Sequence, residues 1–179
     1  MRIIAGTARR TALAAPKGLD TRPTSDMAKE GLFNILTGDI RDTRFLDLFS
    51  GSGAVGLEAL SRGAKEAVFV ENAAPAIAAL MQNMEKTRLT GEVLKMSVAK
   101  AIDALHGRQF DIIFMDPPYD TNLLTRTLDK LANANILAES GIIVAETDSK
   151  PPAVPDVFEV TDTRTYGRCC FMFIKKVFQ

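Results

Sequence analysis

The chain has 179 residues, 46% of them hydrophobic, so it is long enough to bury the core of one compact fold. Its 22 basic and 22 acidic residues give a formal net charge of zero, which argues against a uniformly basic surface. No apolar stretch approaches the roughly 18 residues of a membrane span, and the first residues show no secretory signal. We therefore expect a soluble cytoplasmic protein with no membrane association, in which the adjacent Cys169 and Cys170 are reduced.

The first 24 residues are expected to form an extension ahead of the main fold. Residues 2–5 and 9–14 predict a short β-hairpin, and a loop rich in turn residues follows. Basic charge is concentrated here, because acidic residues are almost absent. A solvated surface arm and a footprint for phosphates both explain such charge, and charge alone favours the arm. The arginines that could contact phosphates are Arg2, Arg9, Arg10 and Arg22.

Helix and strand patterns alternate along the rest of the chain. Helices are expected over residues 27–36, 55–62, 74–88, 99–105 and 123–131. Strands are expected over residues 45–49, 67–71, 92–96, 110–115 and 142–146. Alternation of this kind predicts a parallel sheet covered by helices.

Two final apolar runs, residues 157–165 and 168–177, flank Tyr166 and Gly167 and predict an antiparallel hairpin at the edge of the same sheet. The predicted fold class is therefore α/β and Rossmann-like. It has a seven-stranded, mostly parallel sheet with a terminal antiparallel hairpin, and an N-terminal β-hairpin extension.

A glycine-rich turn joins the first strand of the alternating pattern to the helix that follows it. Gly51, Gly53 and Gly56 have the spacing of a dinucleotide-binding loop, in which glycines let a ligand approach the backbone. Glu71 follows the next strand, where a carboxylate can accept hydrogen bonds from ribose hydroxyls. The loop alone is compatible with NAD, or with a tight turn that binds nothing. Asp47, just before the glycines, can meet a cationic amino-acid group, which favours S-adenosyl-L-methionine.

The tetrapeptide Asp116-Pro117-Pro118-Tyr119 follows the apolar run 110–115, where open α/β sheets bind their ligands. Its two prolines have fixed φ and hold the carbonyls of Asp116 and Pro117 in set directions. A carboxylate and a carbonyl can accept the two protons of an amine while the Tyr119 ring stacks on a planar group. Nucleobases have both features. Standing alone, the tetrapeptide would be better explained as a rigid turn with a surface tyrosine, but here it follows the glycine-rich loop.

Together these segments resemble the class I S-adenosylmethionine-dependent methyltransferases, and more narrowly the RsmD family of bacterial 16S ribosomal RNA guanine-N2 methyltransferases. The resemblance covers essentially the whole chain. The glycine loop alone would identify only the superfamily. The segments that carry the narrower resemblance are residues 2–6, 21–26 with Glu30, 32–36, 47–58, 61–64 and 116–119.

The resemblance implies catalytic roles for Asp116, Pro117 and Tyr119, without a metal. The expected cofactor contacts are Asp47, Phe49, Ser50, Gly51, Gly53, Glu71, Asn72, Ser97, Val98 and Ala99. Asp47 and the glycines would hold the methionine part of S-adenosyl-L-methionine, Glu71 its ribose, and residues 97–99 its adenine. The family usually has a polar Asn or Asp in this region, near the adenine. Val98 is apolar and cannot take that role, so backbone groups or Ser97 are expected to recognise the adenine here.

The implied substrate is the N2 amine of a guanine in 16S ribosomal RNA, in an assembling small subunit. Residues 1–24 would then be an RNA-binding extension and residues 25–179 the methyltransferase domain. DNA adenine-N6 and protein glutamine-N5 methyltransferases remain alternatives, since their targets also present an amino group beside a planar system. A non-catalytic RNA-binding assembly module is a further alternative. The choice of guanine over adenine depends on the resemblance, because the clamp at Asp116 would accept either amine.

Overall fold

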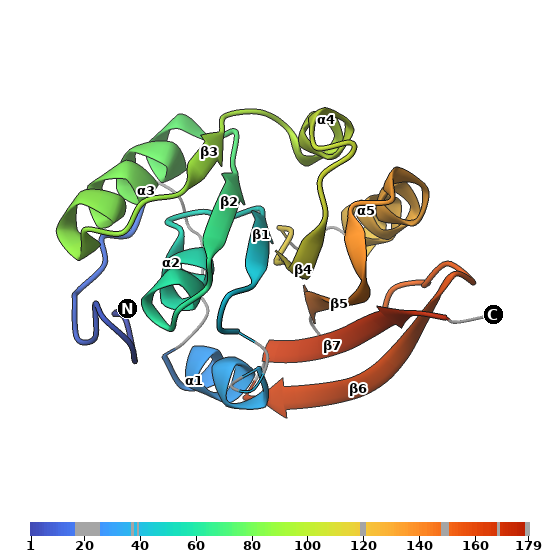
Figure 1. Cartoon of the computed structure of the whole chain (residues 1–179), viewed down its shortest axis with the longest axis horizontal. Coiled ribbons are helices and arrows are strands. Elements are labelled where there is room, and N and C mark those ends of the chain that lie inside the picture. Colours follow the sequence, from blue (N-terminus) through green and yellow to red (C-terminus); the bar gives the residue numbers. More distant parts are fainter. Residues whose placement is uncertain are drawn as a thin grey trace.

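The structure is a computed structural model and describes residues 1–16, 26–36, 38, 40–118, 121–147, 151–167 and 169–177. Helices and strands alternate along the chain as the sequence predicts (Figure 1). The helices are α1 (Asp26–Ile35), α2 (Ala54–Ser61), α3 (Ala74–Thr87), α4 (Val98–Ala104) and α5 (Thr121–Ala134). The strands are β1 (Arg44–Leu48), β2 (Glu66–Val70), β3 (Glu92–Leu94), β4 (Phe110–Met115), β5 (Leu137–Thr147), β6 (Phe158–Tyr166) and β7 (Cys169–Lys176).

Within the described residues the strands form one seven-stranded sheet in the order β3-β2-β1-β4-β5-β7-β6. Strands β1 to β5 run parallel, and β7 runs antiparallel to both β5 and β6. The strand order reverses between β1 and β4, and ligands of open α/β sheets bind at such a reversal, outside the carboxyl ends of the strands. The predicted fold class is confirmed, and the topology points to the carboxyl ends of β1 and β4 as the binding edge.

Helices cover both faces of the sheet, with α1, α2 and α3 on one side and α4 and α5 on the other (Figure 1). Successive strand residues point to opposite faces. Phe45, Phe114 and Val144 accordingly belong to the core beneath α2, whereas Ile113 and Ile143 belong to the core beneath α4 and α5. The same alternation decides which polar residues at the strand ends share a face.

Strand β5 and the N-terminal hairpin differ most from their predicted form, while α5 is longer and β3 shorter than predicted. Strand β5 begins at Leu137 rather than at residue 142, because Phe110 pairs with Leu137 before the register shifts and Ile112 pairs with Ile142. The N-terminal hairpin is closed by a single bridge between Arg2 and Ala12 instead of two extended strands. The hydrophobic pattern of residues 138–141 is too weak to predict the longer strand.

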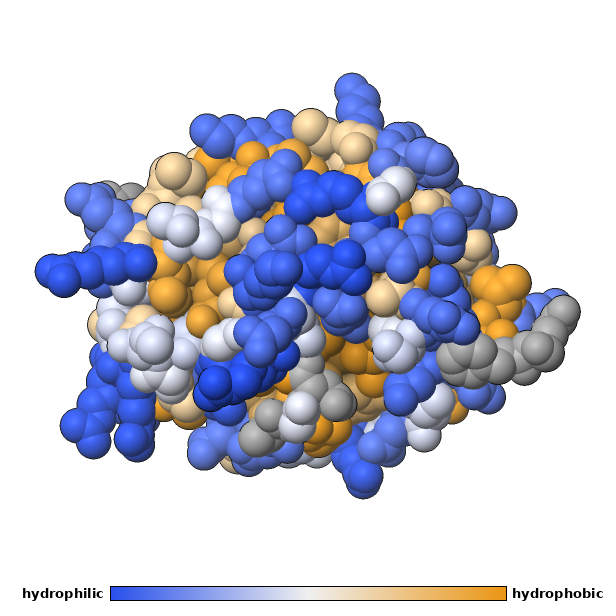
Figure 2. Space-filling model, in the orientation of Figure 1, coloured by the Kyte–Doolittle hydropathy of each residue, from blue (hydrophilic) through white to orange (hydrophobic). Residues whose placement is uncertain are grey.

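The surface shown in Figure 2 is mostly hydrophilic, and apolar residues reach it in several separate areas. Among the described residues, no helix is both long enough and apolar enough to cross a bilayer.

Candidate active site

The loop between β1 and α2 has an unusual backbone. Phe49, Gly51 and Gly53 have φ values of 61°, 54° and 77°, in the left-handed region that glycine adopts most readily. A Cβ on Gly53 would lie 2.2 Å from Cδ1 of Leu80, whereas a Cβ on Gly51 would meet no atom within 4 Å. A side chain at position 53 would have to displace Leu80 and adopt a strained positive φ, while Gly51 borders open space that a ligand could use.

Asp47 lies near the end of β1, and its side chain is buried, with the residue only 1% exposed. Its Oδ2 accepts a hydrogen bond from the N–H of Gly56 at 2.9 Å. Burial raises the pKa of Asp47 to about 7; the bond from Gly56 opposes this rise and the charge of Glu71 adds to it. No ion pair between the described residues includes Asp47. An ammonium group brought by a ligand would favour the ionised carboxylate.

Glu71 follows β2 and fastens the glycine loop to the end of that strand. Its carboxylate accepts hydrogen bonds from the N–H groups of Gly51 at 2.9 Å, Asn72 at 2.8 Å and Ala73 at 2.8 Å. A carboxylate has about four acceptor positions, so three backbone bonds leave room for a ribose hydroxyl.

The predicted adenine loop, Ser97 to Ala99, follows β3 and opens α4. The N–H of Glu71 donates to the carbonyl of Leu94 at 3.2 Å, which brings the end of β3 beside the predicted ribose position. The Val98 side chain is buried and belongs to the core beneath α4, and its contact with a cofactor remains a prediction. Backbone groups and the half-buried Ser97 remain available to an adenine.

Another predicted cofactor contact, Ser50, holds the loop together. Its N–H and its hydroxyl both donate to the carbonyl of Val70, at 3.0 Å and 3.3 Å. The structure therefore gives the Ser50 side chain a structural partner, and cofactor contact by Ser50 remains a prediction.

Asp116 and Pro117 follow β4, at the same edge of the sheet as the glycine loop. Asp116 is half-buried and Pro117 is buried, and the predicted stacking residue Tyr119 lies outside the described residues. Burial raises the pKa of Asp116 well above its usual value, and the negative charges of Glu146 and Asp47 raise it further. Carboxylates with strongly raised pKa values at a sheet edge of this kind are candidates for function.

Glu146 and Cys169 also belong to this edge, although the sequence pattern did not single them out. The Cys169 thiol is hydrogen-bonded to the carboxylate of Glu146, and burial together with that charge raises the pKa of the thiol. Both residues follow the strand alternation that places Asp116 on the face beneath α2. Their closeness to Asp116 could have identified them as site residues. That closeness can be recognised only once the pairing register of the strands is known.

The N-terminal segment is attached to α1 and α2 through one buried carboxylate. Glu58 is completely buried and accepts hydrogen bonds from the N–H groups of Ile4 at 2.8 Å and Ala5 at 3.0 Å. It also pairs with Lys29 at 3.3 Å and with Arg62 at 2.7 Å. Every described charge in this cluster has an opposite charge beside it, so the cluster is suited to holding the segment in place.

A second buried side chain connects the N-terminal segment with the glycine loop. Asn83 accepts a hydrogen bond from the N–H of Ala14 at 2.7 Å, and its amide donates to the carbonyls of Ala14 and Ser52, each at 3.0 Å. Residues near position 14 are therefore held beside the loop that borders the predicted cofactor.

Three of the four predicted RNA-binding arginines lie on the surface of the N-terminal segment, and Arg22 lies outside the described residues. Arg9 and Arg10 are exposed. The side chain of Arg2 is 63% exposed and pairs with Asp26 at 3.5 Å. Strongly hydrophilic side chains gather at the edge of Figure 2 where Figure 1 places this segment.

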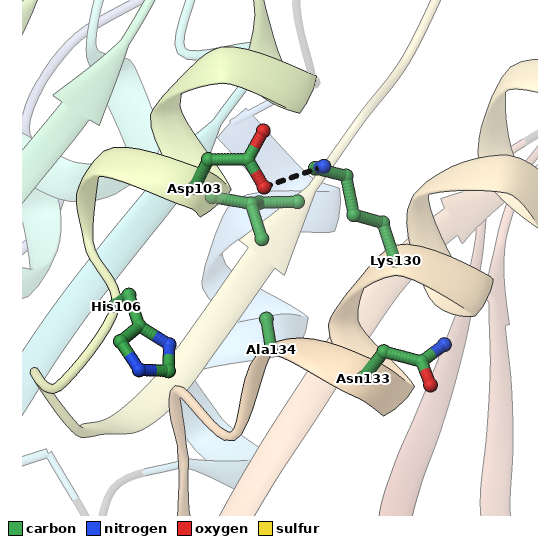
Figure 3. Close-up of a pocket in the computed structure, with 6 residues that line it drawn as sticks. Asp103, His106, Lys130, Asn133 and Ala134 are labelled. Atoms are coloured by element: carbon green, nitrogen blue, oxygen red, sulfur yellow. Dashed lines mark ion pairs between the residues drawn. The ribbon is translucent and has the colours of Figure 1, made fainter.

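A hollow of about 240 Å³ lies between α4 and α5 (Figure 3). Asp103 and Lys130 form an ion pair of 2.6 Å across it, and His106, Asn133 and Ala134 line it. It lies beside the ends of helices that precede β4 and β5, hence at the amino edge of the sheet and on the face opposite α2. It is therefore separate from the edge that carries Asp47 and Asp116.

The described residues include no group of three or more His, Cys, Asp or Glu side chains placed to hold a metal ion.

The protein-family model described as "Conserved hypothetical protein 95" matches residues 1–175. The chain belongs to this family. Two curated relatives are both named ribosomal RNA small subunit methyltransferase D. The Haemophilus influenzae protein is 34% identical over 93% of this chain and 89% of its own length, and the Escherichia coli protein is 33% identical over 98% and 90%. The resemblance to the RsmD family is thereby confirmed.

Among solved structures, the Escherichia coli protein named "Putative methyltransferase yhhF" superimposes on this member of the family with a TM-score of 0.87. It is 33% identical and covers 98% of this chain and 97% of that one. The fold is that of the class I S-adenosylmethionine-dependent methyltransferases.

Proposed function

We propose that the protein transfers a methyl group from S-adenosyl-L-methionine to the exocyclic N2 amine of a guanine in 16S ribosomal RNA. The observation that carries the proposal is the position of Asp116 and Pro117 at the carboxyl end of β4, next to Asp47 and the glycine loop. An acceptor pair for an amine thus lies beside a glycine-rich loop that follows a buried carboxylate. Membership of a family whose curated relatives are named ribosomal RNA small subunit methyltransferases supports the same substrate.

The residues of the β1 edge fit S-adenosyl-L-methionine. The buried carboxylate of Asp47 can meet the ammonium of the methionine part, and Glu71 can accept from a ribose hydroxyl. Gly51 leaves space for close approach to the backbone. When bound, this cofactor supplies a methyl group activated by a positively charged sulfur.

Asp116 and the Pro117 carbonyl prepare the amine for attack. The lone pair of a guanine N2 amine is delocalised into the ring, so the nitrogen is a poor nucleophile. If these two groups accept the two amine protons, the nitrogen can become pyramidal and direct its lone pair at the methyl carbon. The new N–C bond forms as the S–C bond breaks, the sulfur keeps the electron pair, and the nitrogen releases one proton to Asp116 or to water.

The N-terminal segment is the proposed contact to the RNA backbone. A base in folded RNA must leave its stack to reach Asp116, which costs a few kcal/mol and is cheapest in a loop. Phosphate contacts from Arg2, Arg9, Arg10 and Arg22 would set the register without reading sequence. In this division residues 1–24 bind RNA and residues 25–179 carry the chemistry, in the cytoplasm and on an assembling small subunit.

The test is transfer of labelled methyl groups to small-subunit rRNA from a strain that lacks this enzyme. We expect the wild-type protein to label guanine N2, and Asp116→Ala to reduce kcat by at least about 100-fold. Because burial raises the pKa of Asp116 and the proposed role needs the ionised carboxylate, wild-type kcat should rise with pH as Asp116 ionises. Asp129→Ala, an exposed aspartate on α5, is the matched control and should keep full activity.

Unchanged transfer by Asp116→Ala would refute the proposed clamp. Labelling of adenine or of a protein glutamine would point to the other amine methyltransferases. Failure of the wild-type protein to bind S-adenosyl-L-methionine in a calorimetric titration would instead favour a non-catalytic assembly module.

A further inference from the structure

Strand pairing places Glu146 directly beside Asp116. In the parallel pair β4 and β5, Ile113 is opposite Ile143 and Met115 is opposite Ala145. Asp116 follows Met115, and Glu146 follows Ala145. Neighbouring strands are about 4.8 Å apart, so the two carboxylates start from adjacent backbone positions.

Both carboxylates also point to the same face of the sheet. Phe114 and Val144, two residues earlier on each strand, belong to the core beneath α2, and side chains repeat their direction every second residue. Asp47 follows the same alternation from Phe45. Asp116 and Glu146 therefore face the side on which the glycine loop begins.

The surroundings of Glu146 fix its carboxylate at this edge. Cys169 opens β7, which runs antiparallel to β5, so its thiol reaches the carboxyl end of β5 and hydrogen-bonds to Glu146. The carboxyl and thiol groups that act on Asp116 and on one another here are those of Asp47, Glu146 and Cys169; Glu71 also acts on Asp47, and Cys170 on Cys169. In the proposed mechanism Asp116 and the Pro117 carbonyl accept the two amine protons. The half-buried carboxylate of Glu146 is therefore not needed for that task.

The hydrogen-bond pattern of the bases gives such a second acceptor a use. In guanine the N2 amine is flanked by the N1–H group, a donor. In adenine and cytosine the amine is flanked on the Watson–Crick edge by a ring nitrogen that carries a lone pair and accepts. A carboxylate beside the amine site would bind the guanine edge and repel the other two.

We propose that Glu146 accepts the N1–H of the target guanine and thereby selects guanine over other amine-bearing bases. The inference rests on the proposed function and extends it, because the clamp formed by Asp116 and Pro117 does not distinguish one amine from another. Enzymes that read a flipped base do so by hydrogen bonds to its Watson–Crick edge, as proposed here. A site built for a donor rejects an analogue that lacks it by large factors.

The experiment uses the full-length protein and an RNA fragment that contains the methylated nucleotide, once this has been mapped with labelled methyl groups. That nucleotide is either guanine or 2-aminopurine, which keeps the N2 amine but has an acceptor at N1. We expect wild-type kcat/KM to be at least about 100-fold lower for 2-aminopurine. Nearly equal use of the two bases by the wild-type protein would overturn the inference without any variant.

Glu146→Gln should reverse part of this preference. The amide can donate to the N1 of 2-aminopurine, so that base should gain while guanine loses its charged acceptor, and the ratio of the two kcat/KM values should shift by about 100-fold. Glu146→Asp keeps the charge and should keep the preference for guanine. Glu139→Gln makes the same chemical change at an exposed position of β5 and should leave the ratio unchanged.

A structural role for Glu146 predicts a different result from a selective one. If Glu146→Gln slows both bases equally while S-adenosyl-L-methionine still binds, the inference is wrong and the proposed function stands. If the wild-type protein labels no guanine N2 in any RNA, the proposed function itself fails. Should Glu146→Gln not fold, the wild-type comparison of the two bases decides the matter.

Discussion

Two carboxylates of this protein are buried to the same degree but differ in what surrounds them. Glu58, on α2, accepts two backbone N–H groups and has the cations of Lys29 and Arg62 beside it. Asp47, on β1, accepts one backbone N–H and has further negative charge nearby, which helps to raise its pKa to about 7. A compensated charge can serve structure at little cost, whereas an uncompensated one is destabilising until a ligand of opposite charge arrives.

The largest expected effect on stability comes from neutralising Glu58, the carboxylate that is paired with two cations. Glu58→Gln leaves Lys29 and Arg62 without a counter-charge and should lower the free energy of unfolding by about 3–5 kcal/mol. Burial already lowers the pKa of Lys29, so the loss should shrink at alkaline pH, where Lys29 can become neutral. Urea denaturation of the variant and of Glu85→Gln, an exposed glutamate on α3, measures the difference. Equal stability of both variants would show that the charges of the cluster do not need one another.

Neutralising Asp47, the carboxylate without a cation beside it, should instead raise the free energy of unfolding. Because the pKa of Asp47 is raised to about 7, the folded state binds a proton between about pH 4 and pH 7 that the unfolded state releases. Stability from this group is therefore present at low pH and is lost as pH rises through 7. At pH 8, Asp47→Asn should stabilise the free protein by about 1–2 kcal/mol, less than the full shift implies because the new amide must find acceptors. A destabilised variant in thermal unfolding at pH 8 would contradict this prediction.

A smaller effect is expected on the affinity for S-adenosyl-L-methionine when the pH is changed. If the ammonium of S-adenosyl-L-methionine pairs with ionised Asp47, binding below pH 7 must first remove a proton. The affinity should fall about tenfold between pH 8 and pH 6, with release of a proton that calorimetry in buffers of different ionisation enthalpy can count. Asp47→Asn should bind more weakly and lose this pH dependence. An identical pH profile in the variant would assign the titration to another group.

Local patterns were sufficient to predict the elements and the edge of the sheet that carries the site. Strand β4 has the predicted bounds, because its apolar run ends abruptly at Asp116. The glycine loop was recognisable because its backbone requires positive φ at Gly51 and Gly53. The predicted start of strand β5 is five residues too late, since the first part of the strand lacks a strand pattern and is fixed by pairing to β4.

Relations between distant residues could not be predicted in the same way. Glu146 is an ordinary glutamate at the end of a strand until the register places it beside Asp116. Glu58 and Asn83 likewise gain their roles from backbone groups more than 50 positions away along the chain. The roles predicted for Tyr119 and Arg22 lie outside the described residues and remain predictions.

The direction of β7 has a practical consequence for binding measurements. The strand starts at the candidate active site with Cys169 and runs to the opposite edge, where the ammonium of Lys176 donates to the carbonyl of Leu137 at 2.7 Å. Met1, by contrast, is half-buried, and its sulfur accepts a hydrogen bond of 3.9 Å from Ser52 in the glycine loop. A purification tag or a sensor-chip linkage is therefore better attached after β7, where it stays clear of the site, than ahead of Met1.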